Sequence, residues 1–229
     1  IYYSPSFDNG LTWQGGFTTA YKLFDTGGGL NPSPTVGLDG SLHLFQVRSD
    51  GASGLDLYHM QSNPARTTWG PATMIHNGRI GSMMKAITTS TGRLIAPFGD
   101  STVPPPAGYG NNKTYVQHRD VGSTSFATSP DTLISQVPST WNGASDGACE
   151  PTVIEKNDGS LWMLMRSQTG KLTQSFSTNG GANWTAATNS NFYTTSGPPC
   201  MVRMDNGDMV MLWNNATMPP KHNNKIWNA

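Results

Sequence analysis

The sequence predicts an all-β protein, a β-propeller of four-stranded antiparallel blades, of which about four are visible in its 229 residues. Two recurring elements support this prediction: a turn motif that ends in an aromatic residue, and a hairpin motif centred on a glycine. The third observation is that no stretch shows helical periodicity for longer than a turn or two. We therefore expect residues 1–229 to form one propeller domain.

The turn motif opens the chain as SPSFDNGLTW, residues 4–13, and returns as SFSTNGGANW, residues 175–184. Asn and Gly tolerate positive φ, and Asp bonds its own backbone, so each copy predicts a tight turn with a packed tryptophan. Weaker copies give four aromatic ends in all, spaced by 56, 57 and 58 residues: Trp13, Trp69, Phe126 and Trp184. This period is typical of a repeat protein. We expect these turns to brace the blades, with Asp8 bonding its own turn rather than marking a catalytic site.

The hairpin motif lies between these turns and consists of two apolar, β-rich runs on either side of a glycine. Its four copies are PSPTVGLDGSLHLF, MKAITTSTGRLIAPF, EPTVIEKNDGSLWML and PPCMVRMDNGDMVML, with turn glycines Gly40, Gly92, Gly159 and Gly207. Each copy predicts a hairpin of two strands. Adding the strands around the aromatic turn gives about four strands per repeat, which is the blade of a propeller.

The composition excludes several classes of function. Only 12% of the residues are charged and the formal net charge is zero, so no part is basic enough to bind nucleic acid. No run approaches the roughly 18 apolar residues that a membrane span requires, and the N-terminus lacks the features of a signal peptide. With 26 glycines and 16 prolines, the composition resembles that of a secreted β-protein. We expect a secreted or periplasmic location, with any export signal removed.

The two cysteines, Cys149 and Cys200, fit neither a disulfide framework nor a zinc pattern. We therefore expect no structural metal and no cofactor. Both cysteines open successive inner strands, so a disulfide between them could form if their Cα atoms lie within about 7 Å.

One blade differs from its siblings at two positions of the hairpin motif. Nine residues before the turn glycine, the four repeats carry Asn31, Met83, Glu150 and Pro198. Seven residues after it, they carry Val47, Gly99, Arg166 and Asn214. Structural positions should be repeated, whereas functional positions should break the repeat, so Glu150 and Arg166 are the candidate site. We expect them to face one another at the mouth of the central channel; the alternative is an ion pair that braces one blade.

The motif SxDxGxTW, matched by residues 6–13 and partly by 177–184, resembles the Asp-box of sialidases and related BNR-repeat proteins. Residues 149–184 are similar to the sialidase blade in which a glutamate opens the inner strand, an arginine follows the DG turn, and an Asp-box closes the blade. The stretch MVRMDNGDMVMLWNN resembles the following blade. The similar segments cover most of the chain, more closely from about residue 146 onward.

This resemblance implies a retaining exo-α-sialidase that removes sialic acid or a related acidic sugar from a glycan. Arg166 would belong to a cluster that clamps the substrate carboxylate, and Glu150 would help remove the proton of a tyrosine nucleophile. Asn31 stands where the first arginine of the cluster is expected, and Asn214 is a further binding candidate. A sialidase propeller has six blades, so we expect a segment of a longer protein, with the third arginine and the tyrosine beyond Ala229.

Weaker candidates lie elsewhere in the chain. Arg79 and Lys85 are candidates for substrate binding, and Asp100 and Asp146 for acid/base work, with Asp25 also open. The histidines at 76, 118 and 222 are read as surface or turn residues. Two alternatives to a sialidase remain: a polysaccharide lyase with a His or Tyr base, and a non-catalytic propeller that binds glycan or protein.

Overall fold

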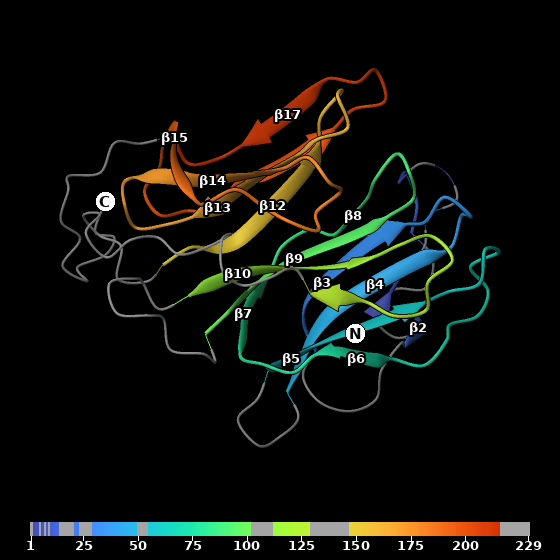
Figure 1. Cartoon of the computed structure of the whole chain (residues 1–229). Helices are drawn as coiled ribbons and strands as arrows, with labels where there is room; N and C mark the ends of the chain where they lie inside the picture. The colour runs from blue at the N-terminus through green and yellow to red at the C-terminus, as the bar shows by residue number, and fades with distance from the viewer. Residues whose placement is uncertain are drawn as a thin grey trace.

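The computed structural model describes residues 2–4, 6, 8, 10–13, 21–22, 29–49, 55–101, 112–128 and 147–215. In these residues the secondary structure is entirely β, arranged in one short pair of strands and four larger units (Figure 1). The short pair is β1 (Tyr2–Tyr3) and β2 (Tyr21–Lys22). No helix in the described part of the chain is long and apolar enough to cross a membrane.

The four units are antiparallel sheets whose strands follow one another along the chain. The first blade contains β3 (Gly29–Val36), β4 (Leu42–Ser49), β5 (Leu55–Gln61) and β6 (Thr73–His76). The second contains β7 (Ile80–Met83), β8 (Ile87–Thr88), β9 (Leu94–Asp100), β10 (Lys113–Arg119) and β11 (Ala127–Thr128). The third contains β12 (Cys149–Glu155), β13 (Leu161–Arg166), β14 (Lys171–Ser177) and β15 (Thr188–Tyr193). The fourth is described through its inner hairpin, β16 (Cys200–Arg203) and β17 (Met209–Leu212).

This architecture confirms the predicted propeller of four-stranded antiparallel blades. Each predicted hairpin joins the first two strands of a blade, and the aromatic turns of Trp69, Phe126 and Trp184 lie between the last two strands of theirs. The second blade differs in one respect, because its inner strand is divided into β7 and β8, which both pair with β9.

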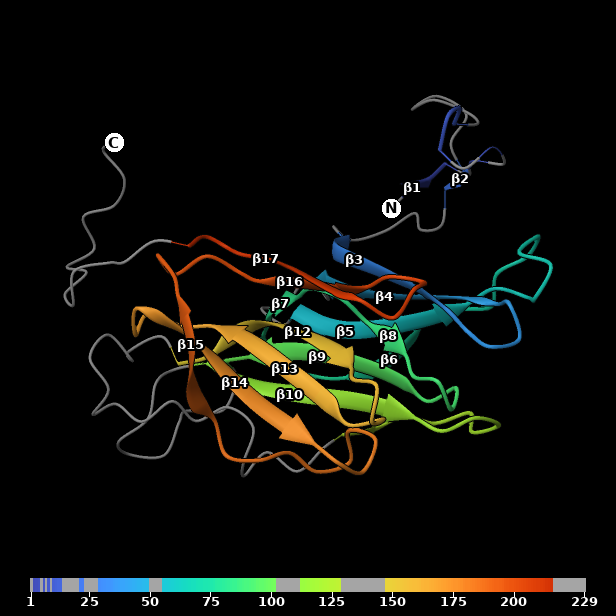
Figure 2. The same ribbon diagram turned by 90° about the horizontal axis from the view of Figure 1, so that it is seen from above.

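The four hairpin turns have the same backbone geometry. In each, the N–H of the turn glycine donates to the carbonyl three residues earlier, at 3.0, 2.8, 3.0 and 2.9 Å for Gly40, Gly92, Gly159 and Gly207. All four glycines have φ between 79° and 91°, a region that other residues rarely adopt. The turns point to one end of the molecule, the right-hand side of Figure 2, which we call the turn end.

The hydrophobic core lies between neighbouring blades rather than inside any one of them. Phe45 and Leu57 of the first blade pack with Phe98 of the second, and Ile95 of the second packs with Met163 of the third. The middle strands are therefore covered on both faces, and β9 is buried along its whole length. Burial on both faces explains why these strands are continuously apolar in the sequence.

The inner strands are joined from blade to blade by a repeated hydrogen bond. The Ser33 hydroxyl accepts the backbone N–H of Ala86 at 2.7 Å, and the Thr152 hydroxyl accepts that of Met201 at 3.3 Å. Ser33 and Thr152 each lie seven residues before their turn glycine. The sequence repeat is therefore also a repeat of contacts around the axis.

The Asp-box turns are structural, as the sequence predicts. The Ser6 hydroxyl accepts the N–H of Gly10 at 2.7 Å, and Asp8 accepts the N–H of Thr12 at 2.8 Å. The same bonds recur in the third blade, from Gly181 to Ser177 at 2.9 Å and from Asn183 to Asn179 at 2.9 Å. Hydrogen bonds from Thr12 and Ser6 lower the pKa of Asp8 to about 2.

The predicted packing of the tryptophans is confirmed in one blade and not in another. Trp184 is 4% exposed and donates its indole N–H to the carbonyl of Gly181 at 3.0 Å. Trp13 is 65% exposed, so the expectation that it packs between strands is wrong for the described structure. Its turn is accompanied there by only the two-residue strands β1 and β2, which offer little surface to cover an indole ring.

Candidate functional site

Glu150 and Arg166 meet at the end of the third blade opposite its hairpin turn. Glu150 is the second residue of β12 and Arg166 is the last residue of β13, where it pairs with Cys149. Nη1 of Arg166 donates to Oε1 of Glu150 at 2.9 Å. The Arg166 side chain is 33% exposed and that of Glu150 is 23% exposed, so the pair remains accessible to a ligand. The predicted contact between the two residues is present.

The backbone at Glu150 is in a conformation unusual for a glutamate. Its φ is +49°, and the register of β12 against β13 shifts between Cys149 and Thr152. Asn31 occupies the equivalent position of the first blade with φ +50°, at a matching shift between Leu30 and Ser33. Such bulges redirect a side chain at the end of a strand. The sequence signal is that a proline follows each of these residues in the inner strand.

Ser196 and Asn214 extend the site toward the fourth blade. Nε of Arg166 donates to the Ser196 hydroxyl at 3.2 Å, and Ser196 itself has φ +67°. The Asn214 side chain packs against Gly197, the residue after Ser196, so closely that an added Cβ on Gly197 would lie 2.5 Å from Nδ2 of Asn214. The structure thus brings Asn214 close to the neighbourhood of Arg166. Ser196 was not predicted, since it belongs to neither repeated motif.

Lys85 extends from the second blade to the inner strand of the fourth. Its Nζ donates to the carbonyl of Met201 at 3.3 Å, and its side chain is half-buried. Lys85 lies seven residues before its turn glycine, where Ser33 and Thr152 carry the hydroxyls that join neighbouring inner strands. It therefore breaks the repeat and places a positive charge among the inner strands.

Asp100 and Arg79 belong to a different group of contacts. Asp100 is 4% exposed, with one carboxylate oxygen 2.9 Å from Nε2 of His76 and the other accepting the backbone N–H of Arg79 at 3.0 Å. The Arg79 side chain is exposed. His76 is consequently held between the first two blades, which differs from the expected surface or turn role. His118, at the end of β10, is half-buried, and burial lowers its pKa.

Asp25, Asp146 and His222 lie outside the described residues. Cys149 and Cys200 are not joined by a disulfide, so the bridge that the sequence allowed is not formed. Within the described ranges, no group of three or more His, Cys, Asp or Glu side chains is arranged to hold a metal ion.

Comparison with known proteins identifies the family and the fold. The sequence pattern of the BNR repeat-like domain family matches residues 1–227. A search of curated protein sequences finds no significant match.

Solved structures with a similar fold include two sialidases and a lyase. A Hadza microbial sialidase is 13% identical with a TM-score of 0.64, over 93% of this chain and 47% of its own. The Trypanosoma rangeli sialidase, solved as a covalent intermediate with 2,3-difluorosialic acid, is 14% identical with a TM-score of 0.58. The match covers 91% of this chain and 37% of the sialidase. An ulvan lyase from a new polysaccharide lyase family is 10% identical with a TM-score of 0.51, and the match covers 80% of this chain and 42% of the lyase. This chain thus spans about half or less of the length of these proteins.

Proposed function

Because the chain belongs to the BNR repeat-like domain family, we propose that the protein is a glycan-active hydrolase that cleaves a terminal acidic sugar, such as sialic acid, with retention of configuration. One observation carries the proposal: the 2.9 Å contact between Arg166 and Glu150 at the accessible end of the third blade. The first blade has neutral residues, Asn31 and Val47, at the two equivalent positions. The first and third blades therefore have the same strand arrangement, but only the third carries the Arg166–Glu150 pair.

Each member of the pair has a role suited to its chemistry. A guanidinium is planar and permanently charged, so Arg166 would hold the carboxylate of the sugar through paired hydrogen bonds. Glu150 would accept the proton of a nucleophilic hydroxyl as its oxygen bonds to the anomeric carbon. The glycosidic bond would break in the same step, its oxygen leaving with a proton from a general acid, and water would then hydrolyse the covalent intermediate. A neutral nucleophile suits an anionic substrate, because the negative charge of the sugar would repel an anionic nucleophile. Asn31, Lys85 and Asn214 would contribute further polar contacts to the glycan.

The backbone of Glu150 gives independent support. A residue with a side chain that adopts positive φ costs about 1–2 kcal/mol relative to an ordinary conformation. Asn tolerates this region because its short side chain bonds locally, which suits Asn31, but Glu has no such advantage. Strain of this kind is concentrated at functional sites, where surrounding structure maintains it. We infer that Glu150 is kept at this position for what its carboxylate does.

A polysaccharide lyase is the second candidate, favoured by one structural neighbour and by the His76–Asp100 pair. A lyase removes the proton next to the carboxylate of a uronate, and an imidazole oriented by a buried carboxylate is suited to that step. In this alternative, Arg79 or Arg166 would neutralise the uronate.

The test measures the full-length protein on a panel of sialosides and uronate polymers. Arg166→Lys keeps the charge but loses the planar fork, so KM should rise about tenfold or more. Glu150→Gln keeps the shape and removes the base, so kcat should fall by about 10²–10⁴-fold with little change in substrate binding. Arg203→Lys is the matched control, because Arg203 bonds the carbonyl of Glu155 at the turn end.

Three results would contradict the hydrolase. Unsaturated products from uronate polymers would identify a lyase, with His76→Gln as the inactivating variant. Glycan binding without turnover would identify a binding propeller. If both site variants lower only the melting temperature, the Arg166–Glu150 pair is a structural brace.

A further inference from the structure

A pocket of about 280 Å³ opens at the turn end, between the first and second blades. The hairpin turns of both blades line it, through Leu38 and Asp39 on one side and Gly92 on the other. Glu150 and Arg166 lie at the opposite ends of the strands, so this pocket is separate from the proposed active site. Its volume is just below the usual range of small-molecule pockets, about 300–1,000 Å³, and suits one sugar-sized ligand.

The floor of the pocket is a buried polar network. His43 and His59 are 3% and 6% exposed, and Nδ1 of His43 lies 3.0 Å from Nε2 of His59. Gln61 donates to the Ser41 hydroxyl at 3.1 Å, and that hydroxyl lies 3.2 Å from the His43 ring. Burial, together with the positive charge of Arg119, lowers the pKa of His43 to about 4 and that of His59 to about 3. Both imidazoles are therefore neutral near pH 7.

Arg119 is the permanent cation among the residues that line the pocket. Its Nη2 donates to Oε1 of Gln61 at 3.1 Å and lies 3.4 Å from Nδ1 of His43. The guanidinium carbon lies 5.1 Å from the centre of the Phe126 ring, which holds the group in place from one side. Nε and Nη1 have no hydrogen-bond partner among the described residues. The arginine is thus fixed through one nitrogen and keeps donors for a ligand.

Arg119 also breaks the sequence repeat. Counted from the aromatic ends, the first position of the turn motif is Ser6, Ser62 and Ser177 in three copies and Arg119 in the fourth. In two of the serine copies the hydroxyl accepts a backbone N–H of its own turn. A structural position should carry serine here as well, so the arginine points to a separate role.

The remaining lining residues define the chemistry of the ligand. Asp39 is held by the Ser41 hydroxyl at 2.7 Å and is exposed, so it can accept hydrogen bonds from ligand hydroxyls. Asp120 is occupied by Nε of Arg93 at 2.6 Å. Leu38 and Val121 are 69% and 68% exposed at the rim and offer apolar surface to the C–H face of a sugar ring.

We propose that this pocket binds a monosaccharide-sized hydroxycarboxylate, such as a uronate unit, with its carboxylate on Arg119 and its hydroxyls toward Asp39. The site is independent of the proposed hydrolase activity, because it shares no residue with the mouth of the channel. The positive charge of Arg119, the hydrogen-bond acceptor Asp39 and the volume of the pocket together define this ligand.

The experiment titrates the ¹⁵N-labelled full-length protein with glucuronate and follows the Nε–H resonance of Arg119, with glucose as the neutral probe. Glucuronate should shift this resonance in a saturable way, and glucose should not. Arg119→Lys should weaken glucuronate binding about tenfold or more, followed through the Gln61 side-chain amide. Val121→Trp should weaken it while leaving Arg119 in place, since it covers the pocket from an exposed position.

Two control variants separate this site from others. Arg203→Lys changes an arginine that joins the third and fourth blades through the carbonyl of Glu155, so it should leave binding intact. Arg166→Lys should also leave the Arg119 titration unchanged, whatever it does to turnover. The proposal is overturned if glucose and glucuronate shift the resonance equally, if no shift occurs, or if binding survives in both Arg119→Lys and Val121→Trp.

Discussion

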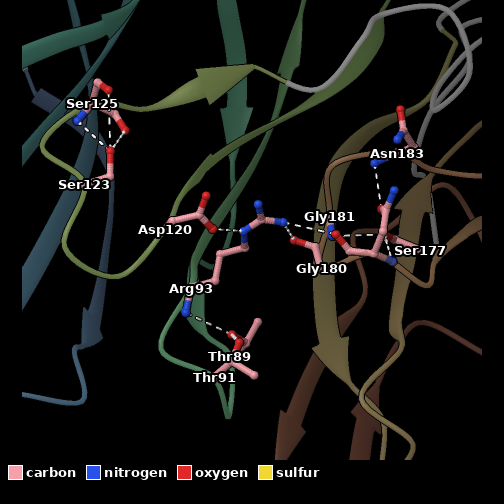
Figure 3. Close-up of polar contacts among 11 residues, drawn as sticks. Thr89, Thr91, Arg93, Asp120, Ser123, Ser125, Ser177, Gly180, Gly181 and Asn183 are labelled. Atoms are coloured by element: carbon pink, nitrogen blue, oxygen red, sulfur yellow. Dashed lines mark hydrogen bonds and ion pairs between the residues drawn. The ribbon is translucent and has the colours of Figure 1, made fainter.

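Two junctions between neighbouring blades have equivalent strands but different side chains. One joins the first and second blades, and the other joins the second and third. In the latter, Arg93, the residue before β9, donates to the carbonyls of Asn179 and Gly180 at 3.1 and 2.8 Å (Figure 3). In the former, the residue equivalent to Arg93 is Ser41, which bonds within its own blade. An arginine at this position closes one junction, whereas a serine leaves room for the pocket in the other.

The turns that face these two positions differ in the same sense. In the third blade the Asp-box turn is tight, and Gly181 packs directly against the second blade. In the second blade the turn has lost the Asp-box serine, and Arg119 projects toward the first blade instead. The two junctions thus differ at a few side chains, and one of them holds a pocket, although the strands that frame them are equivalent.

The largest expected effect is on the pH dependence of the open junction. The folded pKa values of His43 and His59 lie below the ordinary value of 6.5, so the unfolded chain binds protons that the folded one does not. The contribution of the two histidines to the free energy of unfolding should therefore be fully present above pH 6.5 and should be lost as the pH is lowered toward 4. By pH 5 the loss should reach up to about 2 kcal/mol for each histidine. Asp39 and Arg119, the charged neighbours, keep their charge over this range.

Urea denaturation between pH 7 and pH 4.5 measures this effect. His59→Gln should remove about half of the pH dependence of the unfolding free energy that the two histidines contribute. In the unsubstituted protein, NMR titration should show the His59 ring neutral down to about pH 4. A slope unchanged by His59→Gln would mean that other groups cause the pH dependence.

A glycine substitution in the closed junction should have the next largest effect. Gly181 has φ +86°, and an added Cβ would lie 2.9 Å from Cδ1 of Ile95. Backbone strain and overpacking together should lower the free energy of unfolding by about 3 kcal/mol in Gly181→Ala. Gly122 has φ +78° with nothing within 4 Å, so Gly122→Ala should cost only the strain, about 1–2 kcal/mol. Equal losses by chemical denaturation would show that the closed junction is not tightly packed.

The smallest effect is expected from the arginine that closes the second junction. Arg93→Ala removes the bonds to Asn179 and Gly180 and the ion pair with Asp120, and should lower the free energy of unfolding by about 1–2 kcal/mol. Arg66→Ala removes a single bond to the carbonyl of Gly40 at an exposed position and should cost under about 0.5 kcal/mol. Differential scanning calorimetry compares the two variants, and a smaller loss for Arg93→Ala than for Arg66→Ala would contradict the account.

Sequence reasoning selects a candidate site where residues depart from a strong repeat. Glu150 and Arg166 were found because their siblings are neutral, and the hairpin required them to return to one end of the blade. Arg119 departs from its repeat just as clearly. The sequence does not single it out, because the Asp-box predicts a purely structural turn, which is correct for the turns at Ser6 and Ser177.

The sequence by itself determined the local features: the four glycine turns, the aromatic turns, the alternation of strands and the period that makes them blades. These features depend on residues close together in the chain, since positive φ and side-chain-to-backbone bonds are decided within a few positions. Only the tertiary structure decided which side chains meet between blades. Arg119 of the second blade reaches Gln61 of the first, 58 residues earlier in the chain. Arg93 of the second blade reaches Gly180 of the third, 87 residues later. Such contacts depend on how neighbouring sheets pack, which no local pattern specifies.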